Sequence, residues 1–519
     1  MAKLYGKLLA DLGYLSRGRL VVKNASDFIA QYIGQSLQQT KDILNEARGN
    51  VLLIDEAYML DPKRNGASRG CPFRKEVIDT LVGEVQNRPG EDLCVIMCGY
   101  EKEMTDFIRD ANPGLARRFP IENAFVFEEF DEEQLGKVLD LKMGEQCLST
   151  TSEGRAAALG VLKLAKQRPN FGNGGEIDNL LSRAMLSFQS RFGATPVDQR
   201  FRASKAGLLL PEDFDPDHLR GVDAEEEMDR EFSGMIGLEA QMGMFKRLAR
   251  QANAMKKFKR EPQAIMPFTL VLKGPPGCGK TTFAKKLGRI YYNMGILATQ
   301  DVVEASAQDM IGEFMGQTVH RTRGLLEKGL GKVLFIDEAY RLAGTNSAEG
   351  YAAEARDELV HALTKPQFAR RMVVVLAGYS APMDELLKIN PGLAGRFPTQ
   401  LQFEKLSSAA CAKLLKKRIE DSNVTAAFEE DDPRIQGFFQ EARLLDCWAN
   451  GRDVETLAAE IVRRSIEVAA DQYSHELSIP AANCGSVLEV IEEWGHRNEL
   501  TISREYHGPL ANLGYGLSD

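Results

Sequence analysis

A glycine-rich segment in the second half of the chain has the residue types that bind phosphate groups. Its residues are Gly274, Pro275, Pro276, Gly277, Cys278, Gly279, Lys280, Thr281 and Thr282. Glycines let backbone N–H groups crowd around phosphates, a lysine reaches the β and γ oxygens, and a threonine hydroxyl can ligate Mg²⁺ at a helix N-terminus. The segment therefore predicts an ATP-binding loop, with Lys280 on the phosphates and Thr281 on Mg²⁺.

An acidic pair, Asp337 and Glu338, follows the apolar run that begins at Val333. Parallel α/β sheets bind their ligands at the carboxyl ends of the strands, so we expect this pair beside the glycine-rich loop. Asp337 would then orient the water shell of Mg²⁺, and Glu338 would polarise the attacking water. An acidic pair can also end a strand by chance, and the nearby phosphate loop is what favours hydrolysis.

The elements around these residues alternate between apolar runs and helical stretches. An apolar run from Phe268 to Leu272 precedes the loop, and a helix is expected from Thr281 to Arg289. A further apolar run extends from Met372 to Ala377. This alternation is typical of an α/β fold with a parallel sheet covered by helices on both faces. A helix-rich segment follows each such pattern, and we interpret it as a small helical lid.

The chain contains an internal repeat. The residues from Val51 to Tyr58 recur from Val333 to Tyr340, a displacement of 282 residues. The segment that starts at Asn112 recurs at Asn390. Shifting the second copy back by 282 residues places the counterpart of the phosphate loop before residue 1, so we expect no ordinary nucleotide binding in the first copy.

These patterns predict two tandem P-loop modules of α/β fold, the first truncated at its N-terminus. The expected parts are a truncated core lacking the phosphate loop at 1–130, a helical lid at 131–194, an acidic linker at 195–230, a complete core at 231–406, a second lid at 407–475 and a C-terminal tail at 476–519.

Composition is that of an ordinary globular protein, with 44% hydrophobic and 27% charged residues. The net charge of −9 argues against a surface devoted to nucleic-acid phosphates. A basic cluster at 256–260 is interpreted as a solvated helix end, with a nuclear-import signal as the alternative. The sequence shows neither a secretory signal nor an apolar run long enough for a membrane span, so we expect an intracellular, cytoplasmic or nuclear protein.

Several motifs together resemble the AAA+ ATPases, and within them the CbbX/CfxQ family, which has rubisco-activase-like and sporulation-stage-V-protein-K-like members. The motifs are the Ile-Asp-Glu-Ala-Tyr strand end, Ala377-Gly378-Tyr379, the loop that starts at Asn390, and Asn450-Gly451-Arg452. The likeness covers both modules, roughly residues 2–191 and 232–464.

The resemblance assigns roles to two arginines. Arg396 matches the finger that a neighbouring subunit inserts to stabilise charge on the transferring phosphoryl group, which implies an oligomeric ring such as a hexamer. Arg452 matches the lid arginine that senses the γ-phosphate within its own subunit. The first copy keeps Arg118 but has Gly175 in place of Arg452. The alternative for each arginine is a surface ion pair.

The resemblance also suggests pore loops that grip polypeptide through an aromatic, an apolar residue and a glycine. The matching residues are Tyr32, Ile33 and Gly34 in the first copy and Phe314, Met315 and Gly316 in the second. Core packing is the alternative for both. The family's first sensor, an Asn or Thr, is replaced here by the Gly378-Tyr379 strand end.

The preferred hypothesis is an oligomeric, Mg²⁺-dependent ATPase that remodels an unidentified protein client, with no membrane partner. One alternative is a regulatory scaffold whose degenerate first module docks partners while ATP stabilises assembly. A nucleic-acid motor is less favoured, because the chain is acidic and has no recognisable DNA-binding helix motif.

Overall fold

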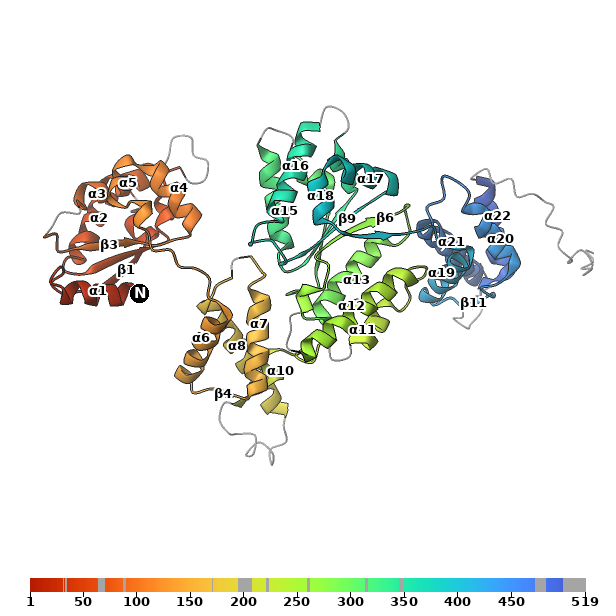
Figure 1. The fold of residues 1–519 in the computed structure, drawn as a ribbon, viewed down its shortest axis with the longest axis horizontal. Coiled ribbons are helices and arrows are strands. Elements are labelled where there is room, and N and C mark those ends of the chain that lie inside the picture. The colour runs from red at the N-terminus through yellow and green to blue at the C-terminus, as the bar shows by residue number, and fades with distance from the viewer. Residues whose placement is uncertain are drawn as a thin grey trace, which may run out of the picture. The chain divides into compact units, whose positions relative to one another are not determined.

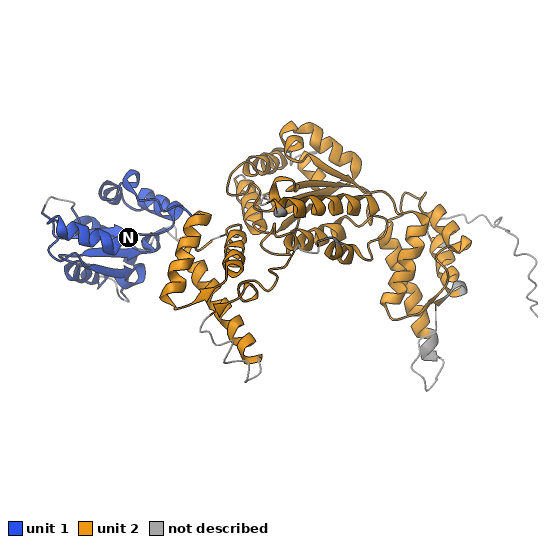
Figure 2. Cartoon of the chain, turned by 60° about the horizontal axis from the view of Figure 1, so that its bottom comes forward, with its two compact units in different colours: residues 1–129 blue, residues 130–519 orange. Residues whose placement is uncertain are grey.

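The structure is a computed structural model, and it contains two compact units. It describes residues 1–30, 32, 35–63, 71–86, 90–169, 171–194, 208–220, 224–258, 262–312, 316–344, 349–471 and 482–497. The units are Met1–Glu129 and Phe130–Asp519 (Figure 2). None of the described helices is long and apolar enough to cross a membrane.

The first unit is built on a parallel sheet with the strand order β1-β2-β3 (Figure 1). Its strands are β1 (Leu20–Asn24), β2 (Val51–Asp55) and β3 (Cys94–Met97). Its helices are α1 (Ala2–Asp11), α2 (Gln35–Glu46), α3 (Pro72–Glu84), α4 (Glu101–Ala111) and α5 (Pro113–Arg118), with short 3-10 helices η1 (Ala25–Phe28), η2 (Ala57–Leu60) and η3 (Ile121–Asn123). One hydrophobic core, centred on Phe28, Leu52 and Phe107, joins the sheet to its helices.

The second unit contains a five-stranded parallel sheet with the order β10-β6-β9-β8-β7. Its strands are β6 (Thr269–Lys273), β7 (Val302–Ser306), β8 (Val333–Asp337), β9 (Val373–Gly378) and β10 (Thr399–Gln402). Every residue of the central strand β9 is buried. A continuous apolar run is what a strand needs when both faces of its sheet are covered, so the expected fold class is confirmed.

Helices cover both faces of this sheet. One core contains side chains of α11 (Ala224–Phe232), α12 (Glu239–Lys257) and α13 (Lys280–Asn293), including Phe232, Phe245 and Phe283. The core on the other face draws on the remaining helices. These are α14 (Ala307–Met310), α15 (Gln317–Gly329), α16 (Glu349–Ala362), α17 (Ser380–Ile389) and α18 (Pro391–Arg396), together with the 3-10 helix η5 (Ala339–Ala343). A further 3-10 helix, η4 (Pro262–Ala264), precedes β6.

The two sheets differ at one edge. Strands β1, β2 and β3 correspond to β7, β8 and β9, whereas the described residues of the first unit contain no counterpart of β6. The segment that matches β10 forms η3 instead, because β10 pairs with β6 alone. Strand β3 is consequently an edge strand and only half-buried. Apolar side chains of α1 and of residues 125–127 are exposed, including Leu8, Phe125 and Phe127.

The first helical lid is longer than the sequence suggested. It contains α6 (Glu132–Glu145), α7 (Ser152–Ala165), α8 (Gly174–Ala194), α10 (Pro211–Phe214), and the strand pair β4 (Ser149–Thr150) and β5 (Leu208–Leu209). Leu209 and Phe214 are buried in its core, and Arg191 pairs with the buried Asp213. Part of the expected linker at 195–230 therefore packs into the lid, and α11 at its end packs against the second core.

The second lid likewise extends beyond its expected limit at residue 475. It contains α19 (Ser408–Asp421), α20 (Pro433–Ala442), α21 (Gly451–Asp471), α22 (Cys484–Arg497), and the strand pair β11 (Ala426–Ala427) and β12 (Ala482–Asn483). Helix α22 buries Val487, Val490 and Ile491 in the lid core. Trp494 of the same helix meets Trp448 edge to face, with ring centroids 5.3 Å apart. Residues 482–497, expected in the tail, thus belong to this lid.

Candidate nucleotide-binding site

The glycine-rich loop joins the end of β6 to the start of α13, as the sequence predicted. Gly274, Gly277 and Gly279 have φ values of 157°, 67° and 87°. Residues with a side chain are strained at such positive φ values, whereas glycine is not. A Cβ on Gly277 would also lie 1.8 Å from the carbonyl oxygen of Ala449. The loop therefore requires glycine for its conformation and for its close approach to the lid.

Lys280 begins α13 and its ammonium group turns back onto the loop. Nζ donates to the carbonyl oxygens of Gly274 and Pro275, at 2.8 and 2.7 Å. These are weak partners for a full positive charge, and phosphate oxygens at the same place would satisfy it better. Thr281 and Thr282 follow in the first helical turn, where Thr281 is half-buried and Thr282 is exposed. The arrangement fits a bound triphosphate.

Cys278 lies inside the loop with its thiol buried. Sγ donates to the carbonyl oxygen of Pro275 at 2.9 Å. Burial raises the pKa of the thiol, and this outweighs the opposing effect of Lys280. The thiol is therefore neutral at physiological pH and acts as a packing group that helps to shape the loop.

Asp337 and Glu338 lie at the carboxyl ends of the strands, which is the end of the sheet where the loop begins. Asp337 ends β8, and the N–H of Gly274 donates to the carbonyl oxygen of Gly378 at the end of β9, at 3.1 Å. Asp337 Oδ1 accepts the N–H of Glu338 at 2.9 Å, and Glu338 has a positive φ of 50°. The backbone thus turns sharply at the end of β8, on the side of the sheet where the loop follows β6.

Two neighbours of Glu338 were not assigned a role from the sequence. The Tyr340 hydroxyl lies 3.3 Å from Glu338 Oε1, and Arg341 Nη2 lies 2.8 Å from Oε2. The Tyr340 ring packs against Tyr379 with centroids 5.6 Å apart. Lys280 Nζ lies 5.9 Å from the Tyr379 ring centroid. The sequence could have singled out the two tyrosines, because both recur in the first copy at matching positions.

The second lid contacts the loop directly. Asn450 Nδ2 donates to the carbonyl oxygen of Pro276 at 3.0 Å, and the N–H of Gly451 donates to that of Gly277 at 3.0 Å. Asn450 is buried with a φ of 53°, and its Oδ1 accepts the N–H of Leu406 at 3.2 Å. Arg452 follows, exposed, in the first turn of α21. The lid motif and the phosphate loop are therefore brought together.

Arg396 is not brought to the loop of its own chain. It ends α18, and its backbone carbonyl accepts from Thr269 at the start of β6, whereas the loop follows the end of that strand. Its Nη1 donates to the carbonyl oxygen of Gly392 at 2.9 Å. Among the described residues, its buried Nε has no hydrogen-bond partner.

The expected pore-loop residues are only partly described. Tyr32 is 67% exposed, which differs from the core-packing alternative for that residue. Gly316 has a φ of 81° and caps the start of α15. Ile33, Gly34, Phe314 and Met315 lie outside the described residues.

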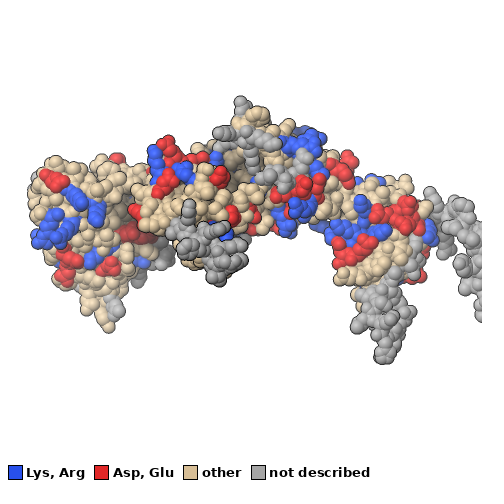
Figure 3. Space-filling model, turned by 90° about the horizontal axis from the view of Figure 1, so that it is seen from below, with Lys and Arg blue, Asp and Glu red and all other residues tan. Residues whose placement is uncertain are grey.

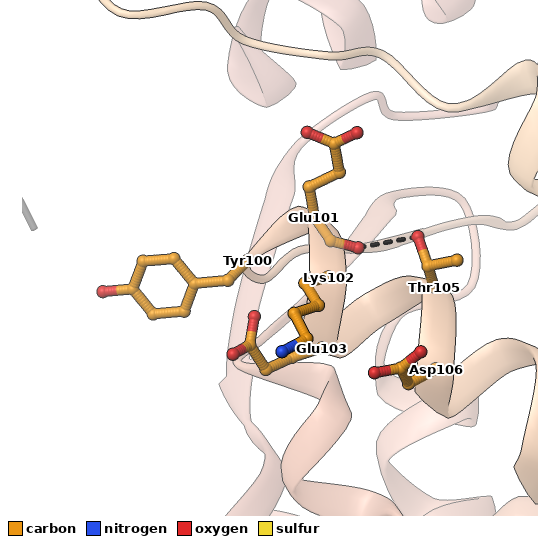
Figure 4. A pocket seen from close by; sticks show the side chains of 6 residues that line it. All are labelled: Tyr100, Glu101, Lys102, Glu103, Thr105 and Asp106. Atoms are coloured by element: carbon orange, nitrogen blue, oxygen red, sulfur yellow. Dashed lines mark hydrogen bonds between the residues drawn. The ribbon is translucent and has the colours of Figure 1, made fainter. Parts of the chain in front are cut away.

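The first unit keeps the acidic turn, while its described residues include no phosphate loop. Asp55 Oδ1 accepts the N–H of Glu56 at 3.0 Å, and Tyr58 donates to the Glu56 carboxylate. Beside the same sheet edge is a pocket lined by Tyr100, Glu101, Lys102, Glu103, Thr105 and Asp106 (Figure 4). Its three carboxylates outnumber the single lysine, so its charge does not suit a triphosphate.

Comparisons with known proteins agree with this geometry. The model of the ATPase family associated with various cellular activities (AAA) matches residues 7–125 and 270–405, and that of an AAA lid domain matches 131–224. The chain is 30% identical over 280 residues to stage V sporulation protein K of Bacillus subtilis, covering 50% of this chain and 85% of that protein. The chain belongs to the AAA family, and its P-loop is a nucleotide-binding site.

Secretion proteins of mycobacteria are also similar. ESX-1 secretion system protein EccA1 of Mycobacterium tuberculosis is 33% identical over 243 residues, covering 44% of this chain and 41% of that protein. ESX-3 secretion system protein EccA3 of Mycobacterium leprae is 30% identical over 288 residues, covering 52% of this chain and 43% of that protein. The chain thus spans less than half the length of these relatives.

Proposed function

We propose that this chain hydrolyses ATP with Mg²⁺ at the site formed by the phosphate loop and the acidic turn. The observation that carries the proposal is the convergence of Lys280, Asp337 and Glu338 at one sheet edge, with the lid motif closed on the loop. Lys280 would bind the β and γ oxygens, and Glu338 would accept a hydrogen bond from the attacking water.

Thr281 and Asp337 would hold Mg²⁺, largely through water. The ion would neutralise charge that develops on the phosphoryl oxygens. Among the described residues no cluster of three or more His, Cys, Asp and Glu side chains forms a metal site of its own. Nucleotide oxygens would supply part of the coordination, so metal and nucleotide should bind together. Arg452, exposed at the start of α21, would contact the γ-phosphate.

The position of Arg396 supports an oligomeric ring. A five-residue strand spans roughly 15 Å, so Arg396 lies too far along β6 to reach a phosphate in its own loop. A neighbouring subunit could present it to that site instead. We place the chain in the CbbX/CfxQ branch on its motifs, and we propose that the ring remodels a protein client through loops that include Tyr32 and Gly316.

Two substitutions test the hydrolytic site. Lys280→Ala should abolish nucleotide binding, because it removes the cation that faces the phosphates. Glu338→Gln should keep binding and stop turnover, because the amide cannot take a proton from water. Phosphate release and binding of a fluorescent ATP analogue are the two measurements.

Glu56→Gln is the matched control, since Glu56 occupies the same turn in the first unit without a phosphate loop. It should leave both measurements unchanged. Full turnover by purified Lys280→Ala or Glu338→Gln protein would remove the proposed site.

A scaffold role is the second candidate, and it applies to the first unit. Its half-buried edge strand β3 and exposed Leu8, Phe125 and Phe127 offer a surface for other proteins. A nucleic-acid motor is not favoured, because acidic and basic side chains are interspersed on the face in Figure 3. A chain that binds ATP but never turns it over would favour the scaffold for the whole protein.

A further inference from the structure

Both carboxylate oxygens of Glu338 are engaged within its own turn. Oε1 faces the Tyr340 hydroxyl at 3.3 Å, and Oε2 pairs with Arg341 at 2.8 Å. The Glu338 and Arg341 side chains are 40% and 41% exposed, so the pair is accessible to solvent. A carboxylate oxygen that accepts from a guanidinium is less available to accept a proton from water.

The first unit shows that the arginine is not needed to build this turn. Met59 occupies the position that matches Arg341. Glu56 nevertheless has a φ of 51°, against 50° for Glu338, and Tyr58 still donates to its carboxylate. The ion pair is therefore an addition at the module that carries the phosphate loop.

We propose that Arg341 is a positioning residue that holds Glu338 in a resting orientation and restrains hydrolysis until the pair opens. This inference rests on the proposed ATPase function. Glu338 must turn an oxygen towards water beside the γ-phosphate, and in the structure Arg341 occupies one oxygen while Tyr340 faces the other. Opening the pair is a small step, because exposed ion pairs are weak and screened by salt.

The test uses Arg341→Met, which reproduces the residue that the first unit tolerates, and Arg341→Lys, which keeps the charge. Arg341→Met should raise the single-turnover rate of ATP hydrolysis by about fivefold at most, which converts to about 1 kcal/mol, the upper range for an exposed pair. The affinity for ATP should stay within about twofold, since Arg341 contacts the Glu338 carboxylate and not the phosphate loop. Arg341→Lys should stay close to the unmodified protein.

A measurement without nucleotide examines the pair itself. A water-soluble carbodiimide with an amine labels free carboxylates, and peptide mass spectrometry reports the labelling rate at each site. Glu338 should be labelled more slowly than Glu56 in the unmodified protein and at a similar rate in Arg341→Met. Labelling of Glu56 should not change.

The outcomes separate this inference from the proposed function. If hydrolysis is present and lost in Lys280→Ala, the proposed function stands. If Arg341→Met then lowers the hydrolysis rate or leaves it unchanged, the restraint is refuted and only this inference falls. Equal labelling of Glu338 before and after the substitution also overturns it. If no ATPase activity is found at all, the proposed function fails first, and the labelling result still decides whether the pair exists.

Discussion

Asn450 links the second lid to the phosphate loop, and replacing it should weaken both the lid and nucleotide binding. Its side chain donates to Pro276 and accepts from Leu406 while fully buried. Asn450→Ala removes both hydrogen bonds and leaves the two backbone groups unpaired. At about 1–2 kcal/mol for each, the lid should lose roughly 2–4 kcal/mol of unfolding free energy.

The backbone adds a second, separable contribution. Asn450 has a φ of 53°, where alanine is strained by about 1 kcal/mol and glycine is not. Asn450→Gly should therefore lose the same hydrogen bonds but retain about 1 kcal/mol more stability than Asn450→Ala. The contact with Pro276 is the part that supports the loop, so ATP affinity should fall about fivefold in both variants.

Tryptophan fluorescence is the assay for the lid. The chain has two tryptophans, Trp448 and Trp494, and both lie in the core of the second lid. A urea titration followed by their fluorescence therefore reports this lid alone. Binding of a fluorescent ATP analogue gives the affinity.

The first lid supplies a matched control. Asn173 has a φ of 45°, and its Oδ1 accepts the N–H of Phe130 at 2.9 Å, so it repeats the local geometry of Asn450. Asn173→Ala should leave the tryptophan transition and ATP affinity unchanged. An unaltered urea midpoint in Asn450→Ala, or an equal loss of affinity in Asn173→Ala, would refute the proposed link between lid and loop.

Two further outcomes follow from the position of Arg396 and from the described residues of the first unit. Arg396→Ala should keep ATP affinity and lose turnover by about 10³-fold, and mixing it with Lys280→Ala subunits, which still carry Arg396, should restore part of the activity. No rescue in verified mixed oligomers would contradict a finger supplied by a neighbour. The 519-residue chain with Glu338→Gln should bind at most one ATP per chain at saturation, because the described residues of the first unit include no counterpart of Lys280 to offset the charge of Asp55 and Glu56. A stoichiometry near two would show that another segment completes the first site.

The loop and the acidic pair could be predicted because their chemistry is local in sequence. The spacing from Gly274 to Thr281 fixes a strand, a turn and a helix start, and an acidic pair after an apolar run fixes a strand end. The lid contact could not be predicted as a contact. Asn450 and Pro276 are 174 residues apart, and only the packing of the lid brings them together.

The extra lid elements were missed for a different reason. Pro211 and its acidic neighbours have the composition of a linker, yet a proline at the first position of a helix and an acidic first turn also begin α10. What decides between the two is the burial of Phe214 and the pairing of Asp213 with Arg191, 22 residues away. Composition carries no information about such a partner.

The turn at Glu338 shows why an unusual backbone conformation is weak evidence for catalysis. Glu56 and Glu338 share a positive φ, and each follows an aspartate that accepts its N–H. A Cβ on Gly378 would lie 2.9 Å from the Tyr340 ring, and one on Gly99 would lie 2.6 Å from the Tyr58 ring.

The same turn thus persists in a unit whose described residues include no phosphate loop. Packing of a tyrosine over a glycine therefore maintains the conformation, and nucleotide chemistry is not required for it. The features that set the second site apart are the loop cation Lys280, the lid contact through Asn450 and the ion pair of Arg341 with Glu338. The proposed activity depends on the first two of these features, whereas the ion pair is proposed to restrain it, so substitutions at Lys280 and Asn450 should weaken nucleotide binding and substitution of Arg341 should not.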